Sequence, residues 1–191
     1  IKALERTFHD LVPHDPAFAA ACARYAGCQP LRPRAGNQAG DHGGGVYFSS
    51  SELHFGDCKF VNNGAPNGGG LCSDSGLLTM SGCSVYWNDS ATGDARGGGL
   101  ACFSSFDIAN TTFMGNLAVF GGNVHLGPSS GGDFLKNIVT YSTMGGGIYA
   151  DSTAREINVQ CCNVSENTGG DYVGAISDLT GTNDNISADP L

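Results

Sequence analysis

The sequence predicts an all-β fold, a right-handed parallel β-helix (solenoid) of about 5–6 coils with an α-helical cap at its N-terminal end. Three observations predict it: a glycine cluster recurring about every 24 residues, period-two alternation of apolar residues between clusters, and an asparagine after most of these segments. We expect a helical cap over residues 1–40 and the β-helix over residues 41–191.

The glycine cluster is the clearest repeat, and each copy ends in one aliphatic residue. Successive copies begin 25, 29, 24, 24 and 24 residues apart, and the sixth, at Gly169, is weaker. The five strong copies are Gly43–Val46, Gly68–Leu71, Gly97–Leu100, Gly121–Val124 and Gly145–Ile148. A unit this short cannot bury its apolar face alone, so we expect the copies to stack along one axis.

Two short strands are predicted between the clusters, because apolar residues alternate on either side of a two-residue step that ends at Cys or Thr. Four copies, Leu53–Asn63, Leu78–Asn88, Phe106–Asn116 and Ile157–Asn167, follow this pattern, whereas the coil between Gly121 and Gly145 fits it poorly. Stacking then predicts two ladders of equivalent residues. The aliphatic ladder is Val46, Leu71, Leu100, Val124 and Ile148, and the asparagine ladder is Asn63, Asn88, Asn116 and Asn167.

The two ends of the chain differ from the repeats. Helices are predicted over Ala3–Leu11 and from Asp15-Pro16 to Gly27, where an N-cap precedes a first-turn proline and a glycine ends the helix. An open solenoid end exposes strand edges, so we interpret this segment as a cap, with a targeting or partner-binding helix as the alternative. The stretch from Asp171 to Leu191 is predicted to be loop-like, without an equivalent cap.

The repeats resemble those of a known class of surface protein. The glycine clusters, alternating with Phe60–Asn63 and Phe113–Asn116, are similar to the GGA(I/L/V) and FxxN repeats of polymorphic outer-membrane adhesins, although Gly or Asn replaces the alanine. More broadly, residues 43–191 resemble bacterial cell-surface β-helix proteins, and Asn185–Leu191 resembles the segment that closes many of them. The resemblance implies architecture more than function, because this fold carries adhesins, lyases, hydrolases and tailspikes.

Composition excludes several classes of function. With 9 basic and 18 acidic residues, the net charge of -9 argues against nucleic-acid binding, and no apolar stretch is long enough to span a membrane. The 8 cysteines include no CxxC motif, which favours disulfides outside the cytoplasm over zinc or redox sites. The candidate pairs are Cys22 with Cys28, Cys58 with Cys83, and Cys72 with Cys102. The alternative is a set of reduced, buried thiols.

Candidate sites outside the core are few. Four Asn-x-Ser/Thr sequons, at Asn88, Asn110, Asn163 and Asn185, predict N-glycosylation in a suitable source. The tail acids Asp171, Asp178, Asp184 and Asp189 could bind calcium, and an ordinary acidic loop is the alternative. Tyr47, Tyr149 and Trp87 could form a sugar-stacking platform, against ordinary packing.

A polysaccharide-active enzyme would need two nearby carboxylates. The predicted outward ladders place no two carboxylates on adjacent coils, and Asp74 and Asp151 share a register but lie three coils apart. We therefore expect a non-enzymatic structural or adhesive module, secreted or on the cell surface, that self-assembles end to end or binds a cell-surface or carbohydrate partner. The alternative is a polysaccharide-binding or polysaccharide-degrading β-helix domain.

Overall fold

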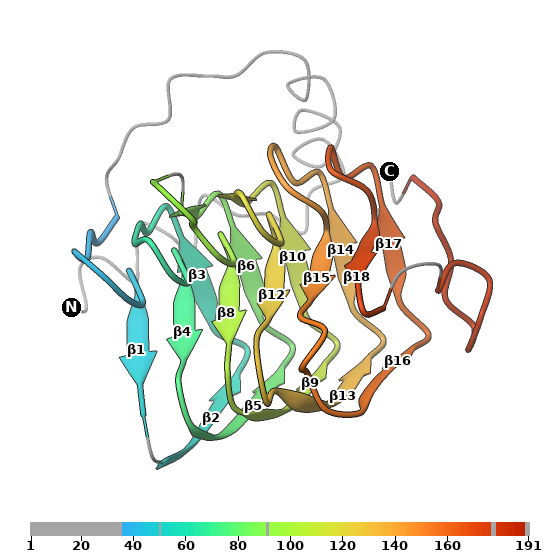
Figure 1. Cartoon of the computed structure of the whole chain (residues 1–191), viewed down its shortest axis with the longest axis horizontal. Coiled ribbons are helices and arrows are strands. Elements are labelled where there is room, and N and C mark those ends of the chain that lie inside the picture. Colours follow the sequence, from blue (N-terminus) through green and yellow to red (C-terminus); the bar gives the residue numbers. More distant parts are fainter. Residues whose placement is uncertain (1–35, 50, 91, 177–178, 190–191) are drawn as a thin grey trace. The chain divides into compact units, whose positions relative to one another are not determined.

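The computed structural model of the chain describes residues 36–49, 51–90, 92–176 and 179–189. These residues form a parallel β-solenoid of about five turns and contain no helix (Figure 1). The predicted helical cap over residues 1–40 lies almost wholly outside them. The solenoid begins slightly before the predicted start at residue 41, because Gln38 already forms a parallel bridge with Gly64.

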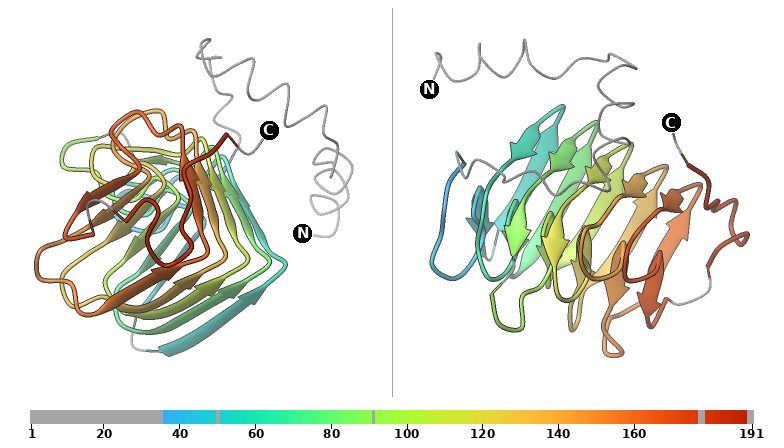
Figure 2. Two further views of the ribbon diagram at one scale, coloured as in Figure 1. Left: turned by 90° about the vertical axis from the view of Figure 1, so that its right-hand side faces the viewer. Right: turned by 90° about the horizontal axis from the view of Figure 1, so that it is seen from above.

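Three parallel sheets run along the solenoid (Figure 2). Each of the five turns contributes one strand to each sheet, and a further strand is added to the first sheet alone. We name them by their first strands. The β1 sheet comprises β1 (Val46–Phe48), β4 (Leu71–Ser73), β8 (Leu100–Cys102), β12 (Val124–Leu126), β15 (Ile148–Ala150) and β18 (Tyr172–Gly174). The β2 sheet comprises β2 (Ser51–Gly56), β5 (Gly76–Ser81), β9 (Ser105–Ala109), β13 (Gly131–Leu135) and β16 (Ile157–Gln160). The β3 sheet comprises β3 (Lys59–Val61), β6 (Ser84–Tyr86), β10 (Thr112–Met114), β14 (Ile138–Thr140) and β17 (Asn163–Ser165), and a short pair is formed by β7 (Asp89–Ser90) and β11 (Leu117–Ala118).

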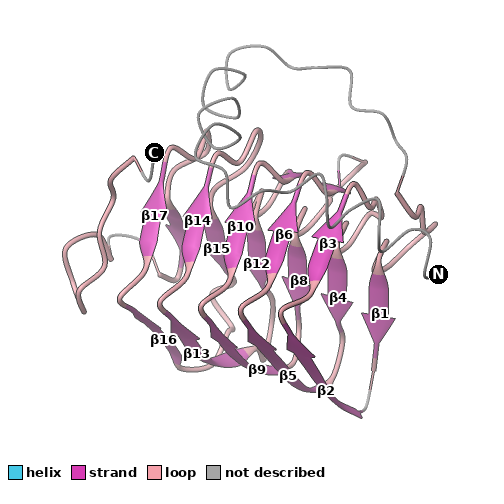
Figure 3. Cartoon of the chain, turned by 180° about the vertical axis from the view of Figure 1, so that it is seen from behind, coloured by secondary structure: helices cyan, strands magenta, loops and turns pink. Residues whose placement is uncertain are grey.

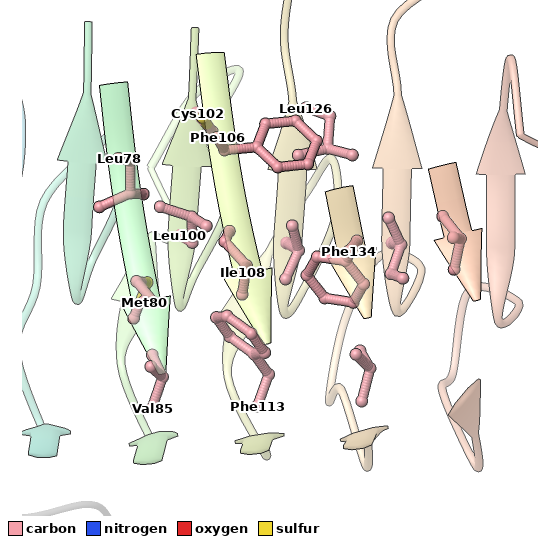
Figure 4. Close-up of a cluster of buried hydrophobic side chains, with 14 of the residues drawn as sticks. Leu78, Met80, Val85, Leu100, Cys102, Phe106, Ile108, Phe113, Leu126 and Phe134 are labelled. Carbon is pink, nitrogen blue, oxygen red and sulfur yellow. The ribbon is translucent and has the colours of Figure 1, made fainter. Parts of the chain in front are cut away.

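The register confirms the predicted aliphatic ladder. Its five residues are paired Cα to Cα from one turn to the next, and Tyr172 continues the row in the weaker sixth copy. The coil that fits the pattern poorly is also in register, because Phe134 pairs with Ile108 on one side and with Val159 on the other. The interior is a continuous stack of apolar side chains (Figure 4). Its largest fully buried members include Phe113 and Phe134, whose rings stack at 5.9 Å.

Left-handed backbone conformations turn the chain at the corners. One row of them begins each glycine cluster, as at Gly97 with φ +58. A Cβ on Gly97 would lie 1.9 Å from the carbonyl oxygen of Leu100, so only glycine fits this corner. Another row lies between the β2 and β3 sheets and consists of Asp57, Gly82, Asn110, Lys136 and Cys161.

The asparagine ladder is continuous and buried, and it contains one member that the sequence pattern missed. Asn63 Nδ2 donates to Asn88 Oδ1 at 3.2 Å, and Asn88 Nδ2 donates to Asn116 Oδ1 at 3.0 Å. Asn116 Nδ2 then donates to Asn123 Oδ1 at 2.8 Å, and Asn123 Nδ2 to Asn167 Oδ1 at 3.0 Å. The ladder therefore links five turns through side-chain amides, with each amide aligned with the next.

Asn123 occupies the ladder because its turn lacks the usual asparagine. The equivalent corner residue in this turn is Ser142, whose backbone N–H donates to Asn167 Oδ1 at 3.0 Å. In the neighbouring turn Gly99 faces Asn116, whose Nδ2 would lie 2.9 Å from an added Cβ. One turn thus exchanges the glycine and asparagine pair for asparagine and serine while keeping an amide in the same place.

The C-terminal residues continue the solenoid, which corrects the expectation of a loop-like tail. Asn185 is buried, donates to the carbonyl oxygen of Val159 at 2.9 Å and accepts the N–H of Cys162 at 3.0 Å. Ile186 forms a parallel bridge with Asn163, and Leu179 packs against the core. The described part of the tail therefore adds a partial rung to the last turn.

Candidate functional site

The outer surface of the β1 sheet carries the most distinctive set of side chains on the described solenoid. The residues that point away from the core form one row, each paired with the next across the sheet. In order they are Tyr47, Cys72, Ala101, His125, Tyr149 and Val173. The inward neighbours, such as Leu100 and Leu126, belong to the core. In the outer row Tyr47 is exposed and Tyr149 and Val173 are half-buried, whereas Cys72, Ala101 and His125 are buried.

Aromatic rings gather on this row and along its edges. The His125 ring stacks on Tyr149 at 5.3 Å with an interplanar angle of 11°, and it lies 5.7 Å from the Phe103 ring. Phe120 also contacts Tyr149, edge-on at 5.5 Å. Nearer the first turn, His42 stacks on Tyr47 at 5.4 Å, and Tyr47 is 48% exposed. We call this surface, with the rings of His42, Tyr47, Phe103, Phe120, His125 and Tyr149, the aromatic face. Figure 1 labels the strands of the β1 sheet on which it lies.

Charged side chains border the aromatic face. Arg96 is exposed and precedes β8, and its backbone forms parallel bridges with Asn67 and Phe120 in the neighbouring turns. Asp151 follows the C-terminal end of β15, and the N–H and hydroxyl of Thr153 donate to its carboxylate at 3.0 and 2.8 Å. These two hydrogen bonds lower the pKa of Asp151, so the carboxylate is charged at neutral pH.

His125 is the buried centre of this cluster and is neutral at pH 7. Burial, assisted by the nearby charge of Arg96, lowers its pKa to about 4, although the charge of Asp151 opposes the shift. Its Nδ1 is buried and has no hydrogen-bond partner among the described residues. The aromatic face can therefore offer ring surfaces flanked by the guanidinium of Arg96 and the carboxylate of Asp151, and its central histidine, His125, does not carry a proton charge at neutral pH.

The predicted sugar platform is corrected in part. Tyr47 and Tyr149 do share the outer surface of one sheet, four rungs apart, which is about 19 Å at the usual strand spacing. Trp87 lies elsewhere, at the corner that follows β6, where its ring meets Tyr86 edge-on at 5.5 Å. Phe103, Phe120 and Arg96 were missed because they lie in turns outside the repeat motif.

The carboxylate ladders also need one correction. Asp107 and Asp133 are direct partners on β9 and β13, so two adjacent coils do stack two acids on the outer surface of the β2 sheet. Both are exposed, and Asn158 Nδ2 donates to Asp133 Oδ1 at 3.0 Å. The pair escaped the sequence prediction because the register of the coil from Gly121 to Gly145 was not visible. Asp74 and Asp151 are three rungs apart as predicted, which is about 14 Å.

The cysteines within the described residues are free thiols. Cys58 and Cys83 donate to backbone carbonyls, Cys58 to Gly56 at 3.2 Å and Cys83 to Ser81 at 3.5 Å. The register does not bring Cys72 and Cys102 together, because Cys72 pairs with Ala101 and the two thiols point to opposite faces of the sheet. The pair Cys22 and Cys28 lies outside the described residues.

These buried thiols are poor nucleophiles. Burial, assisted by the negative charge of Asp74, raises the pKa of Cys72 to about 12, and burial also raises the pKa of Cys83, Cys102 and Cys162. A thiol that stays protonated at neutral pH is unsuited to nucleophilic chemistry. The reduced alternative thus fits the cysteines that the structure describes.

The tail acids are dispersed among separate contacts. Asp171 ends the asparagine ladder, because its Oδ1 accepts Asn167 Nδ2 at 3.0 Å and its Oδ2 accepts the Ser187 hydroxyl at 2.8 Å. Asp189 accepts the phenol of Tyr141 at 2.9 Å, and Asp184 is exposed at φ +58. No group of three or more His, Cys, Asp or Glu residues suited to a metal occurs within the described ranges. Since Asp178 lies outside them, the calcium site stays a prediction.

The four sequons occupy different environments. Asn88 and Asn185 are buried at 0% and 1% exposure, Asn163 is half-buried, and Asn110 is exposed.

Among the residues that the structure describes, no helix is long and apolar enough to cross a membrane. Comparison with protein-family models, curated proteins and solved structures finds no match to this chain. End-to-end self-association stays a prediction.

Proposed function

We propose that this chain is a non-enzymatic structural or adhesive module outside the cytoplasm, a right-handed β-helix that binds a polysaccharide through its aromatic face. The observation that carries the proposal is the row of rings on the outer surface of the β1 sheet, with Phe103, His125, Tyr149 and Phe120 in successive contact. The resemblance of the repeats to those of bacterial surface β-helix proteins and adhesins supports the location.

The shape of the row favours a linear polymer as the ligand. The accessible rings are Tyr47 and the half-buried Tyr149, which lie about 19 Å apart along the axis with buried residues between them, so a polymer is needed to contact both. Aromatic rings present broad apolar surfaces without the loss of much side-chain entropy, which is why they are common at binding surfaces. Arg96 and the flanking carboxylates provide donors and acceptors for hydroxyl groups.

Direct binding measurements test this proposal. Purified chain is titrated by calorimetry with a panel of soluble neutral and acidic polysaccharides, beside the Tyr47→Ala and Tyr149→Ala variants. We expect binding to at least one polysaccharide and a loss of about ten-fold in affinity per ring removed, as for a typical interface anchor. The matched control is Tyr141→Asn, which removes a phenol from a corner off the aromatic face and keeps a residue that tolerates φ +53. Equal affinity of Tyr149→Ala and the native chain would refute the assignment of the face.

A polysaccharide-degrading enzyme is the second candidate, and the Asp107–Asp133 pair is the observation that favours it. Directly paired residues on neighbouring strands have Cα atoms about 4.8 Å apart, so the two side chains can place their carboxyl groups at the separation of about 5–5.5 Å that a retaining glycosidase uses. Release of reducing ends from the same polysaccharides, abolished by Asp107→Asn and by Asp133→Asn, would establish hydrolysis. Binding without any release of reducing ends would leave the adhesive function.

A further inference from the structure

We propose that Asn110 is the sequon asparagine at which the folded chain carries an N-linked glycan. In the transfer step, the Asn110 side-chain nitrogen forms a bond to the anomeric carbon of a lipid-pyrophosphate-linked oligosaccharide. The bond from that carbon to the pyrophosphate oxygen breaks, and the amide loses one proton as the lipid pyrophosphate leaves. The proposal is independent of the ligand of the aromatic face.

Two of the other sequon asparagines are committed to the interior. Asn88 Nδ2 donates to the carbonyl oxygens of Phe60 at 2.9 Å and Tyr86 at 3.2 Å, and to Asn116 Oδ1 at 3.0 Å. Asn185 is equally buried, with Nδ2 on the carbonyl oxygen of Val159 at 2.9 Å. A sugar on either nitrogen would replace these bonds with a large polar group in a closed stack. A chain modified there could not form the native ladder.

Asn163 is held in a different way. Its side-chain amide is half-buried and makes two bonds to one residue, donating to the carbonyl oxygen of Ala188 at 2.9 Å and accepting the Ala188 N–H at 3.2 Å. This pair of bonds extends the β3 sheet by part of a rung, next to the bridge between Asn163 and Ile186. A glycan on Asn163 would separate this segment from the sheet.

Asn110 has none of these obstacles. It is exposed at φ +50 in the corner between β9 and β10, and its backbone N–H donates to the carbonyl oxygen of Leu135 at 3.1 Å. The next residue on one side of this corner row is Gly82, which has no side chain to obstruct a sugar, and Lys136 on the other side is exposed. Within the described part of the chain, the contacts of Asn110 are made by its backbone, so its side-chain amide is available for modification.

The position of this corner also leaves the proposed binding surface open. The corner joins the β2 and β3 sheets, whereas the aromatic face is the outer surface of the β1 sheet (Figure 3). In a three-sided solenoid, the corner between two sheets lies opposite the third sheet. A glycan on Asn110 would therefore extend away from the aromatic face.

The test is secretion of the full chain from insect cells behind an added signal peptide, followed by glycopeptide mapping and removal of glycans with an endoglycosidase. We expect one glycan, on Asn110, and its loss in the Thr112→Val variant, which removes the sequon and keeps both Asn110 and strand character. A glycan on Asn88 or Asn185 of the secreted, folded chain would overturn the inference, as would an unmodified Asn110.

A second measurement, on unglycosylated chain made in bacteria, checks the premise even where secretion fails. Asn88→Gln and Asn185→Gln should each lower the urea midpoint of unfolding by about 1 M, because buried amide bonds are lost. Thr112→Val should leave the midpoint within error of the native chain. Midpoints for Asn88→Gln and Asn185→Gln equal to the native value would overturn the argument that these asparagines are structurally committed.

Discussion

Moving the side-chain amide from position 123 to position 142 tests the central structural argument. The argument is that each turn must place one amide in the asparagine ladder, whichever side of the turn supplies it. The Asn123→Gly variant removes the amide from this turn. Asn123 accepts the backbone N–H and Nδ2 of Asn116 at 3.2 and 2.8 Å, and it donates to Asn167 Oδ1 and to the Thr140 carbonyl oxygen, both at 3.0 Å.

The size of the effect follows from the partners that remain. Asn116 Nδ2 keeps its bond to Val85, and Asn167 Oδ1 keeps the Ser142 N–H, so these groups retain one partner each. The backbone N–H of Asn116 would have no other acceptor among the described residues. A buried N–H group without a hydrogen-bond acceptor costs about 1–3 kcal/mol. With the lost amide bonds added, we expect Asn123→Gly to reduce the free energy of unfolding by about 3 kcal/mol.

The second single variant and the double variant complete the cycle. Ser142→Asn alone places a second amide beside Asn123 and should cost about 2 kcal/mol through overpacking. In the double variant the new glycine makes room for the new asparagine, as Gly99 does for Asn116 in the neighbouring turn. Its stability should lie within about 1 kcal/mol of the native chain, which amounts to a coupling energy of about 4 kcal/mol.

Urea unfolding followed by far-UV circular dichroism measures all four proteins, with equal m-values as the check that the folded states are comparable. The opposite exchange provides a matched control, since Gly99→Asn combined with Asn116→Ser should also recover most of the loss caused by Asn116→Ser alone. A double variant at 123 and 142 that is as unstable as the sum of its single variants would refute the compensation.

Three further predictions follow from single positions. Gly97→Ala should cost at least about 3 kcal/mol, because its Cβ would overlap the Leu100 carbonyl, whereas Gly93→Ala, at φ +63 with no atom nearby, should cost only about 1 kcal/mol by the same urea assay. Phe134→Ala should cost about 4 kcal/mol in thermal or urea unfolding, through the cavity it leaves in the stack. His125 has a folded pKa of about 4, below its unfolded value, so its contribution is complete above about pH 6.5 and is lost as pH falls toward 4. The native chain should therefore lose about 3 kcal/mol over that interval relative to His125→Phe, and parallel pH profiles would contradict this.

The parts of the fold that the sequence predicted are those that every turn needs in the same form. Leu71, Leu100 and Val124 recur because each fills the interior at the same position within its turn. A glycine recurs at the corners where φ is positive and a Cβ would overlap a nearby carbonyl group. The prediction failed in the turn where the chain reaches the same packing by another route. Because Gly132 stands where the other turns have an apolar residue and Ser142 where they have an asparagine, the strand motif of that coil could not be aligned, and the pairing of Asp133 with Asp107 was missed.

The candidate site was hidden for the opposite reason. Successive outward positions on the β1 sheet hold Tyr47, Cys72, Ala101, His125 and Tyr149, which share no chemistry, because neither the core nor the corners constrain them. A search for repeated residues therefore passes over them. They become visible only when the register of the core is carried outward by one residue, which brings rings from separate turns into one row. In a solenoid the interior requires similar residues at equivalent positions of every turn, whereas a ligand site requires particular residues in particular turns. The positions most informative about function are therefore those that keep the register but do not follow the repeat.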